Sequence, residues 1–208
     1  MKLWDKNNSV NEKIIEFTVG DDRLNDLYLI KYDVKASISH AKMLYRSNLL
    51  SEIECDKIIN ILNEILSQAE AGELKIEKEF EDMHSKIEYI LTDKLGDIGK
   101  KIHTARSRND QVLVSIQLYL IDELNFIKAE VKSLFDLLIN LAKKNKNIIM
   151  PGYTHMRAAM PSSFGLWFSA YAEILIDDVI SLNSTIEIIN QNTFCLLYTS
   201  DAADDTPC

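Results

Sequence analysis

The sequence predicts a mainly α-helical protein, in which an N-terminal helical domain precedes the first long helices of a helical bundle. Apolar residues recur at intervals of three and four along most of the chain, which is the spacing of one helix face. No stretch alternates cleanly between apolar and polar residues, so we assign no strand. Residues 100–150 contain neither glycine nor proline, the two residues that most disfavour a helix interior.

The N-terminal domain begins with short helices. Residues 34–49 have helical periodicity, and the Ser-Glu-Ile-Glu sequence at 51–54 is a capping box that starts a second helix. The glycine at position 72 ends that helix. A third helix is predicted over residues 80–95, where Gly96 follows it.

Two longer helices follow. The first has an apolar seam with an average spacing of 3.5 residues, typical of coiled coils, and a predicted length of about 32 residues. Its seam consists of Leu113, Ile116, Leu120, Leu124, Ile127, Val131, Leu134, Leu138 and Leu141. The seam of the second consists of Phe168, Tyr171, Leu175, Val179, Leu182, Ile186 and Ile189. A short connection makes these two helices antiparallel neighbours.

Four further apolar residues lie off the first seam and would otherwise face water: Val112, Tyr119, Phe126 and Phe135. They predict a bundle that other subunits complete. A structural coiled coil without chemistry explains the seams equally well, but it leaves two unusual polar segments unexplained.

The first of these segments is residues 99–111, where basic side chains precede the first long helix. Lys100, Lys101, Arg106 and Arg108 lie near unpaired backbone N–H groups at the helix start, with Asn109 or Asp110 as the cap. Arginine side chains beside a helix N-terminus predict a site for a small molecule rich in carboxylates. The alternative is a solvated basic loop.

The second segment is the connection over residues 150–161, which Pro151–Gly152 and Pro161 bound. Proline fixes the backbone and glycine permits unusual dihedral angles, so we expect a loop of defined shape. Thr154 and His155 lie within it. A histidine on such a loop can transfer protons, although a single histidine is more often structural.

Composition limits the classes of function. The 208 residues carry a net charge of −9, which argues against partners such as nucleic acid or an anionic membrane. The N-terminus lacks the apolar core of a signal peptide, so the cytoplasm is expected. The three cysteines form no disulfide framework and have no metal-ligand spacing, and Cys55 is predicted to be a buried thiol.

The helical pattern stops after Asn192. Residues 195–204 read Cys-Leu-Leu-Tyr-Thr-Ser-Asp-Ala-Ala-Asp, as does one reading frame of a widely used transposase sequencing adapter. We therefore expect residues 1–109 to form the N-terminal domain and residues 110–192 the start of the bundle. Residues 193–208 are predicted to be a non-native tail.

Several motifs together carry a resemblance to a known family. The chain resembles the argininosuccinate lyases of the fumarase/aspartase superfamily from Lys2 to about Asn192. The motifs are Lys2-Leu-Trp-Asp, Phe17-Thr-Val-Gly, Tyr32-Asp with Ser37 and His40, Glu81-Asp-Met-His-Ser, Ile102-His-Thr-Ala-Arg-Ser-Arg-Asn-Asp-Gln, Gly152-Tyr-Thr-His-Met and Pro161-Ser-Ser-Phe-Gly-Leu-Trp. Their number and order make the resemblance specific.

The resemblance implies a fumarase/aspartase-like fold and a reaction. Such enzymes split argininosuccinate into arginine and fumarate by β-elimination, without a cofactor. They are homotetramers whose active sites combine residues of three subunits. A full member is more than twice as long as this chain and carries a mobile Gly-Ser-Ser-x-Met-Pro loop with the catalytic serine. The resemblance thus implies a truncated fragment that is inactive alone.

The resemblance also assigns roles to residues of this chain. Arg108 and Asn109 would hold the succinate carboxylates, with hydrogen bonds from Ser37 and Thr154. His155 would assist proton transfer.

Other residues receive supporting or structural interpretations. His84 would support the site, or it is an ordinary histidine of a helix surface or second layer, and Ser37 could instead be a helix cap. His40 and His103 are expected to be structural.

The chain departs from the family at two positions near these residues. Ala36 replaces a common glycine and adds a methyl group close to the backbone. Arg157 replaces a glutamine and adds charge and length beside His155.

Two alternatives stay open. The first is another fumarate-releasing lyase, such as an adenylosuccinate lyase, a fumarase or an aspartase. The second is a non-enzymatic structural bundle like the lens crystallins of this superfamily. Intact Arg108, Asn109, Thr154 and His155 favour an enzyme.

Overall fold

The computed structural model describes residues 14, 17 and 19–191, and these fall into two compact units. The first unit extends to Tyr119 and the second spans Leu120–Gln191. The N-terminal Lys-Leu-Trp-Asp motif and the predicted non-native tail lie outside the described residues. Among the residues that are described, no helix is both long and apolar enough to span a bilayer. The mainly α-helical prediction is confirmed.

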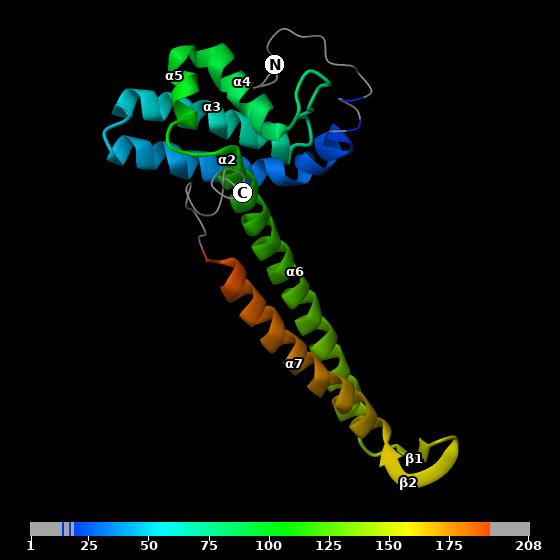
Figure 1. Ribbon diagram of the computed structural model, residues 1–208. Helices are drawn as coiled ribbons and strands as arrows, with labels where there is room; N and C mark the ends of the chain where they lie inside the picture. The colour runs from blue at the N-terminus through cyan, green and yellow to red at the C-terminus, as the bar shows by residue number, and fades with distance from the viewer. Residues whose placement is uncertain (1–13, 15–16, 18, 192–208) are drawn as a thin grey trace, which may run out of the picture. The chain divides into compact units, whose positions relative to one another are not determined.

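The first unit is built from helices that pack on one another (Figure 1). They are α2 (Asp22–Arg46), α3 (Glu52–Glu70), α4 (Met83–Leu95), the short α5 (Asp97–Lys100), a 3-10 turn (Lys101–His103) and the start of α6 (Arg108–Lys144). Helix α2 begins well before the predicted residue 34. The added turns include exposed Leu24 and Tyr28, so their apolar pattern is weak.

Helix α4 begins three residues later than predicted. Asp82 is its N-cap, and the carboxylate accepts a hydrogen bond from the backbone N–H of Ser85 at 2.7 Å. A side chain that satisfies this free N–H group fixes where the helix starts.

The core of the first unit is apolar and comes from α2, α3, α4 and the 3-10 turn. Burying this surface is what stabilises helices of such modest length. The core consists of Ile30, Val34, Ala41, Leu44, Leu50, Cys55, Ile58, Leu62, Ile65, Leu74, Met83, Ile87, Leu91 and Ile102. The prediction that Cys55 is a buried thiol is confirmed.

Helix α3 starts with the predicted capping box. The backbone N–H of Glu54 donates to Ser51 Oγ at 3.3 Å, and the backbone N–H of Ser51 donates to Glu54 Oε2 at 2.9 Å. Lys101 Nζ also donates to the Glu54 carboxylate, at 2.6 Å. Hydrogen bonds from Lys101 and Ser51 hold the pKa of Glu54 at about 2, below its ordinary value.

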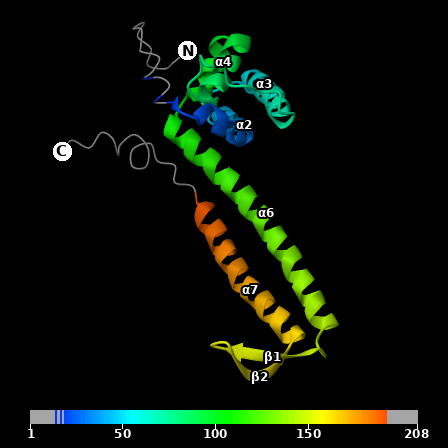
Figure 2. The ribbon, with the colours of Figure 1, turned by 90° about the vertical axis from the view of Figure 1, so that its right-hand side faces the viewer.

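The second unit consists of the later part of α6, strands β1 (Ile149–Thr154) and β2 (Arg157–Ser163), and helix α7 (Phe164–Ile189). Helices α6 and α7 run antiparallel side by side in both views (Figures 1 and 2). Helix α6 has 37 residues, against the predicted length of about 32. Glycine at position 165 lets α7 begin close to the end of α6, because an added Cβ would lie 3.0 Å from the carbonyl oxygen of Ala142 and 2.6 Å from Cα of Lys146, just after α6.

The connection between the long helices is a β-hairpin, so the prediction of a loop without strands was wrong. Strands β1 and β2 are antiparallel, with Pro151 opposite Pro161 and an irregularity between Pro151 and Tyr153. A two-stranded ribbon has two free edges, where a proline without an N–H group can be accommodated. The prolines and Gly152 interrupt the alternating pattern by which a strand is recognised in a sequence.

The predicted seam of α7 is largely confirmed. Its inner face carries Phe168, Leu175, Val179 and later seam residues that are half-buried, whereas Tyr171 is 52% exposed. Ala172 is fully buried in place of Tyr171. The face of α7 that contacts α6 therefore carries the predicted residues, except that Ala172 takes the place of Tyr171.

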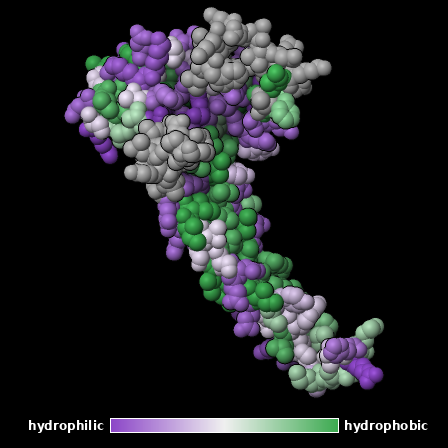
Figure 3. All heavy atoms as spheres, viewed as in Figure 1, coloured by the Kyte–Doolittle hydropathy of each residue, from purple (hydrophilic) through white to green (hydrophobic). Residues whose placement is uncertain are grey.

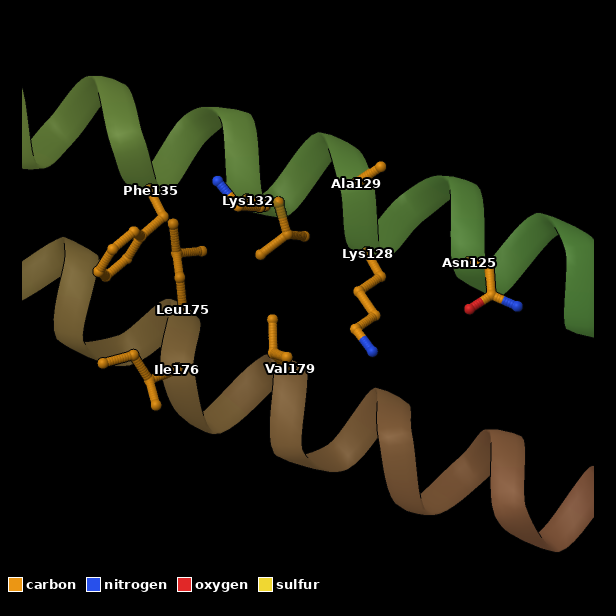
Figure 4. Close-up of a pocket in the computed structure, with 9 residues that line it drawn as sticks. Asn125, Lys128, Ala129, Lys132, Phe135, Leu175, Ile176 and Val179 are labelled. Carbon is orange, nitrogen blue, oxygen red and sulfur yellow. The ribbon is translucent and has the colours of Figure 1, made fainter.

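The predicted seam of α6 agrees only in part with the face that meets α7, where the seam residue Val131 lines a groove between the two helices. Ile127 and Leu134 are 44% and 47% exposed, whereas Phe135 lines a groove between the two helices (Figure 4). Apolar residues lie on several sides of α6, so spacing alone did not identify which side faces α7. The expectation that Phe135 lies off the contact face was wrong.

The two long helices also present apolar side chains outward (Figure 3). Phe126 is 62% exposed, as predicted for a residue off the seam, and Ile180 on α7 is 58% exposed. Tyr119 differs from the prediction, because its ring packs edge-on against Tyr32 with 5.8 Å between centroids.

Replacement of Ser51 by Ala removes two hydrogen bonds between its hydroxyl and Glu54 at the start of α3. We expect the free energy of unfolding to fall by about 1 kcal/mol, measured from urea denaturation followed by circular dichroism. Ser67→Ala is the matched control, since Ser67 is exposed within the same helix. Equal stability of the two variants would contradict a role for the capping box.

Candidate active site

The start of α6 carries the basic segment that the sequence singled out. Ser107 directly precedes the helix, and its hydroxyl accepts a hydrogen bond from the backbone N–H of Asn109 at 3.2 Å. The Asp110 carboxylate accepts from the backbone N–H of Ser107 at 2.8 Å. Ser107 therefore occupies the capping position, and the prediction of Asn109 or Asp110 as the cap was wrong.

Two of the predicted basic residues lie apart from this helix start. Lys100 ends α5 and forms an ion pair with Asp97 at 2.8 Å, and Lys101 pairs with Glu54 at 2.6 Å. Each lysine has an acidic neighbour, so neither belongs to the candidate anion site.

Ser37 lies in the middle of α2 and is completely buried. Its hydroxyl accepts a hydrogen bond from Arg106 Nη1 at 3.0 Å. The alternative interpretation of Ser37 as a helix cap was therefore wrong. The sequence identified Arg106 only as a member of the basic segment. In the structure it is 9% exposed, and its hydrogen bond to Ser37 joins α2 to the start of α6.

Arg108 is half-buried at the first position of α6. Its guanidinium lies 3.7 Å from Asp82 Oδ2 and 3.7 Å from Glu88 Oε2, which is loose for an ion pair. Asn109 follows with an exposed side chain.

Several guanidinium donors at this point lack acceptors. Among the described residues, Arg106 Nε and both terminal nitrogens of Arg108 are buried without a hydrogen-bond partner. These donors are suited to a ligand that carries hydrogen-bond acceptors. Guanidinium groups bind carboxylates with matched geometry, and a carboxylate is the partner that this arrangement suits.

His84 is buried in the first turn of α4, not on a helix surface. Its Nδ1 atom lies 3.1 Å from Oδ2 of Asp33, which is also completely buried. Burial raises the pKa of Asp33 to about 7, although the charges of Arg106 and Arg108 oppose the rise. The sequence motif contained Asp33, but nothing in its spacing indicated that it would contact His84.

His40 and His103 make contacts that suit structural roles. A ring nitrogen of His40 donates to the Thr104 carbonyl at 2.9 Å, and burial lowers the pKa of this histidine. His103 Nδ1 lies 3.0 Å from Glu88, and this hydrogen bond raises the pKa of His103. Glu88 thus contacts both His103 and Arg108.

Thr154 and His155 lie at the tip of the hairpin, in the second unit, and both are exposed. Thr154 pairs with Arg157, so His155 and Met156 form a two-residue turn. Both turn residues have positive φ angles, 49° and 65°, which is the pattern of a type I′ turn. Non-glycine residues rarely adopt this conformation.

The structure thus groups the predicted site residues into two sets. Ser37, Arg108 and Asn109 belong to the first unit, and Thr154 and His155 belong to the second. Among the described residues, no group of three or more His, Cys, Asp or Glu side chains could hold a metal ion.

A family model described as a lyase matches residues 14–199, so the chain belongs to that lyase family.

The chain is also similar to two curated proteins. It is 51% identical over 191 residues to the argininosuccinate lyase of Phocaeicola vulgatus, which covers 92% of this chain and 43% of that protein. It is 47% identical to the argininosuccinate lyase of Thermotoga neapolitana over 92% of this chain and 48% of that protein. The chain spans less than half the length of these relatives.

The fold has solved counterparts. The structure of a fumarate lyase:delta crystallin from Brucella melitensis aligns with a TM-score of 0.71 and 17% identity. The alignment covers 88% of this chain and 46% of that one. At this identity the likeness concerns the fold, and it supports the prediction of a fumarase/aspartase-like helical architecture of which the chain holds part.

The His103–Glu88 contact makes stability depend on pH. A histidine whose pKa is raised by folding stabilises the protein below its unfolded pKa, and this contribution is lost as the pH rises through the folded pKa. We expect His103→Gln to lower the free energy of unfolding by roughly 0.5 kcal/mol at about pH 5.5, because solvent screens a half-exposed pair. At about pH 8.5 the variant and wild type should coincide in urea denaturation.

The control for this experiment is His155→Gln, which changes an exposed histidine at the hairpin tip. It should unfold like the wild type at both pH values. A deficit of His103→Gln that persists unchanged at high pH would contradict the ionic contribution.

Proposed function

We propose that the complete protein is an argininosuccinate lyase, which splits argininosuccinate into arginine and fumarate. The observation that carries the proposal is the 51% identity to an argininosuccinate lyase along 92% of this chain. The unsatisfied donors of Arg106 and Arg108 support it independently, since the substrate carries carboxylates. No cofactor is required for this reaction.

The elimination needs a site of strong positive potential. A proton leaves the carbon next to a carboxylate, and the electron pair of that C–H bond collects on the carboxylate. The C–N bond then breaks, a carbon–carbon double bond forms, and the guanidino nitrogen of arginine leaves with a proton. Donors aimed at the developing charge lower the barrier to the first step.

We assign the roles in the reaction to the predicted residues. Arg108 and Asn109 hold the succinate carboxylates, and Ser37 and Thr154 add hydrogen bonds. His155 assists proton transfer. The base that takes the carbon-bound proton is proposed to be a serine on a loop in the remainder of the protein.

The loose contacts of Arg108 suit an exchange of partners. Its two acidic neighbours are each 3.7 Å away, and neither makes a hydrogen bond with its terminal nitrogens. A substrate carboxylate at a shorter distance would therefore gain hydrogen bonds without breaking strong ones. Asp82 and Glu88 would keep the guanidinium in position between turnovers.

We propose that the working enzyme is a homotetramer of the cytoplasm. Exposed apolar residues on α6 and α7, such as Phe126 and Ile180, support association of the long helices. In such an assembly the hairpin of one subunit would approach the α6 start of another. Thr154 and His155 would then complete the site that Arg108 begins.

We also propose the domain division at residues 109 and 110, with residues 193–208 as translated adapter sequence. An independent genomic read across codons 190–208 tests the second point. A natural reading frame that continues with different residues after about 192 would support it, and an unchanged tail would reject it.

Residues 1–192 alone should not release fumarate, because they lack the proposed catalytic loop and the partner helices. The measurement is the ultraviolet absorbance of fumarate after addition of argininosuccinate. The completed gene product, assayed in parallel, is the positive control. Turnover by the fragment above background would contradict the need for the missing part.

Replacement of His155 by Asn in the completed protein should lower kcat by roughly 10²- to 10⁴-fold, the usual contribution of general acid–base catalysis. Circular dichroism should show unchanged helix content. Asparagine tolerates the positive φ of this turn position.

The matched control is Met156→Asn, at the neighbouring position of the same turn, which should keep most of the activity. Equal activity of His155→Asn and wild type would exclude a catalytic role for His155. A panel with adenylosuccinate, malate and aspartate tests whether another fumarate-releasing reaction is faster than the proposed one.

A further inference from the structure

A buried polar cluster lies where α2, α4 and the start of α6 meet in the first unit. It contains Asp33, Ser37, His84 and Arg106, each at most 9% exposed. Asp33 and Ser37 are four residues apart on α2, so they share one face of that helix. The cluster links three segments that are far apart in the sequence.

Asp33 is the acidic member of this cluster. Its Oδ2 atom lies 3.1 Å from His84 Nδ1 on α4. The positive charges of Arg106 and Arg108, from the start of α6, act on the same carboxyl group, and Asp82 on the α4 side opposes them. Desolvation disfavours the charged form of Asp33, and the two arginines favour it.

Arg106 depends on this carboxylate in return. It is buried, and its one hydrogen bond among the described side chains goes to the neutral hydroxyl of Ser37. A buried guanidinium without an opposite charge is strongly disfavoured. Asp33, Glu88 and Asp110 supply opposite charge to Arg106, and Asp33 acts most strongly of the three.

We propose that Asp33 is a positioning residue that holds the His84 ring with its proton on Nδ1 and keeps Arg106 bonded to Ser37. Asp33 Oδ2 approaches His84 Nδ1 to 3.1 Å, and an ionised carboxylate can only accept, so we place the ring proton on that nitrogen. With Arg106 fixed, the Ser37 hydroxyl accepts a hydrogen bond from the guanidinium, so its own O–H points away from Arg106. The donors at the start of α6 are thus presented in one arrangement.

A purely structural role for Asp33 differs from positioning in one measurable respect. A side chain that only fills the core can be replaced by an equal volume without changing the protonation of His84. A positioning carboxylate cannot be replaced in this way, because the neutral amide of Asn can either accept a hydrogen bond through its oxygen or donate one through its nitrogen.

The first test uses this chain and nitrogen NMR of its histidines. Wild-type His84, assigned by its loss in His84→Gln, should show a protonated Nδ1 at neutral pH. In Asp33→Asn the Nδ1–H form should lose its dominance, while circular dichroism remains helical. Asp26→Asn is the matched control, since Asp26 is also on α2 and accepts from the Met83 backbone N–H without contacting His84.

The spectra give outcomes that overturn the proposal. An unprotonated Nδ1 of His84 in the wild type would overturn it even if Asp33→Asn does not fold. Identical His84 spectra in the wild type and a folded Asp33→Asn would overturn it as well. A change of equal size in Asp26→Asn would show a general effect of charge on α2 and would reject a specific role for Asp33.

The second test rests on the proposed function and uses the completed enzyme. Asp33→Asn should lower kcat/KM by roughly 10- to 100-fold, since displaced donors are costly in a preorganised site. It should also change the pH profile, because a titrating carboxyl group has been removed. Loss of activity without any change in the pH profile would support a structural role only. If the wild-type enzyme released no fumarate, the proposed function would fail, and the NMR experiment would still decide the role of Asp33.

Discussion

The architecture of the first unit depends on a buried charge at the start of α6. Arg106 is inside the protein, and its hydrogen bond to Ser37 ties the chain before α6 to the middle of α2. A guanidinium can be buried only where a carboxylate and hydrogen-bond acceptors surround it. Asp33 and Ser37 supply these from one face of α2. Charge attraction and a hydrogen bond, in place of apolar packing, therefore hold the start of α6 against α2.

The same constraint gives the site its chemical character. Arg108 is two residues after Arg106 and has acidic neighbours at distances too long for strong hydrogen bonds. Its terminal nitrogens are buried and unsatisfied. Under the proposed function, a substrate carboxylate completes these donors.

Two residues at the hairpin tip adopt an energetically costly backbone conformation. His155 and Met156 both adopt positive φ angles, although neither is glycine. Such a conformation costs energy and persists where the surrounding structure enforces it. Here the two strands enforce it, so the histidine is presented at a defined point at the end of two long helices.

The sequence by itself determined the helices, the capping box at Ser51 and the motifs around Arg108 and His155, because these are local patterns. It did not determine the early start of α2, the face of α6 that meets α7, or the hairpin. Proline and glycine concealed the strand pattern, and a helix with several apolar sides has no unique contact face.

Only the tertiary structure brought Asp33 to His84 and Arg106 to Ser37, since these pairs are about 50 and 69 residues apart. Which charged groups are buried and paired depends on which helices pack together. The spacing of residues along the sequence does not show that packing.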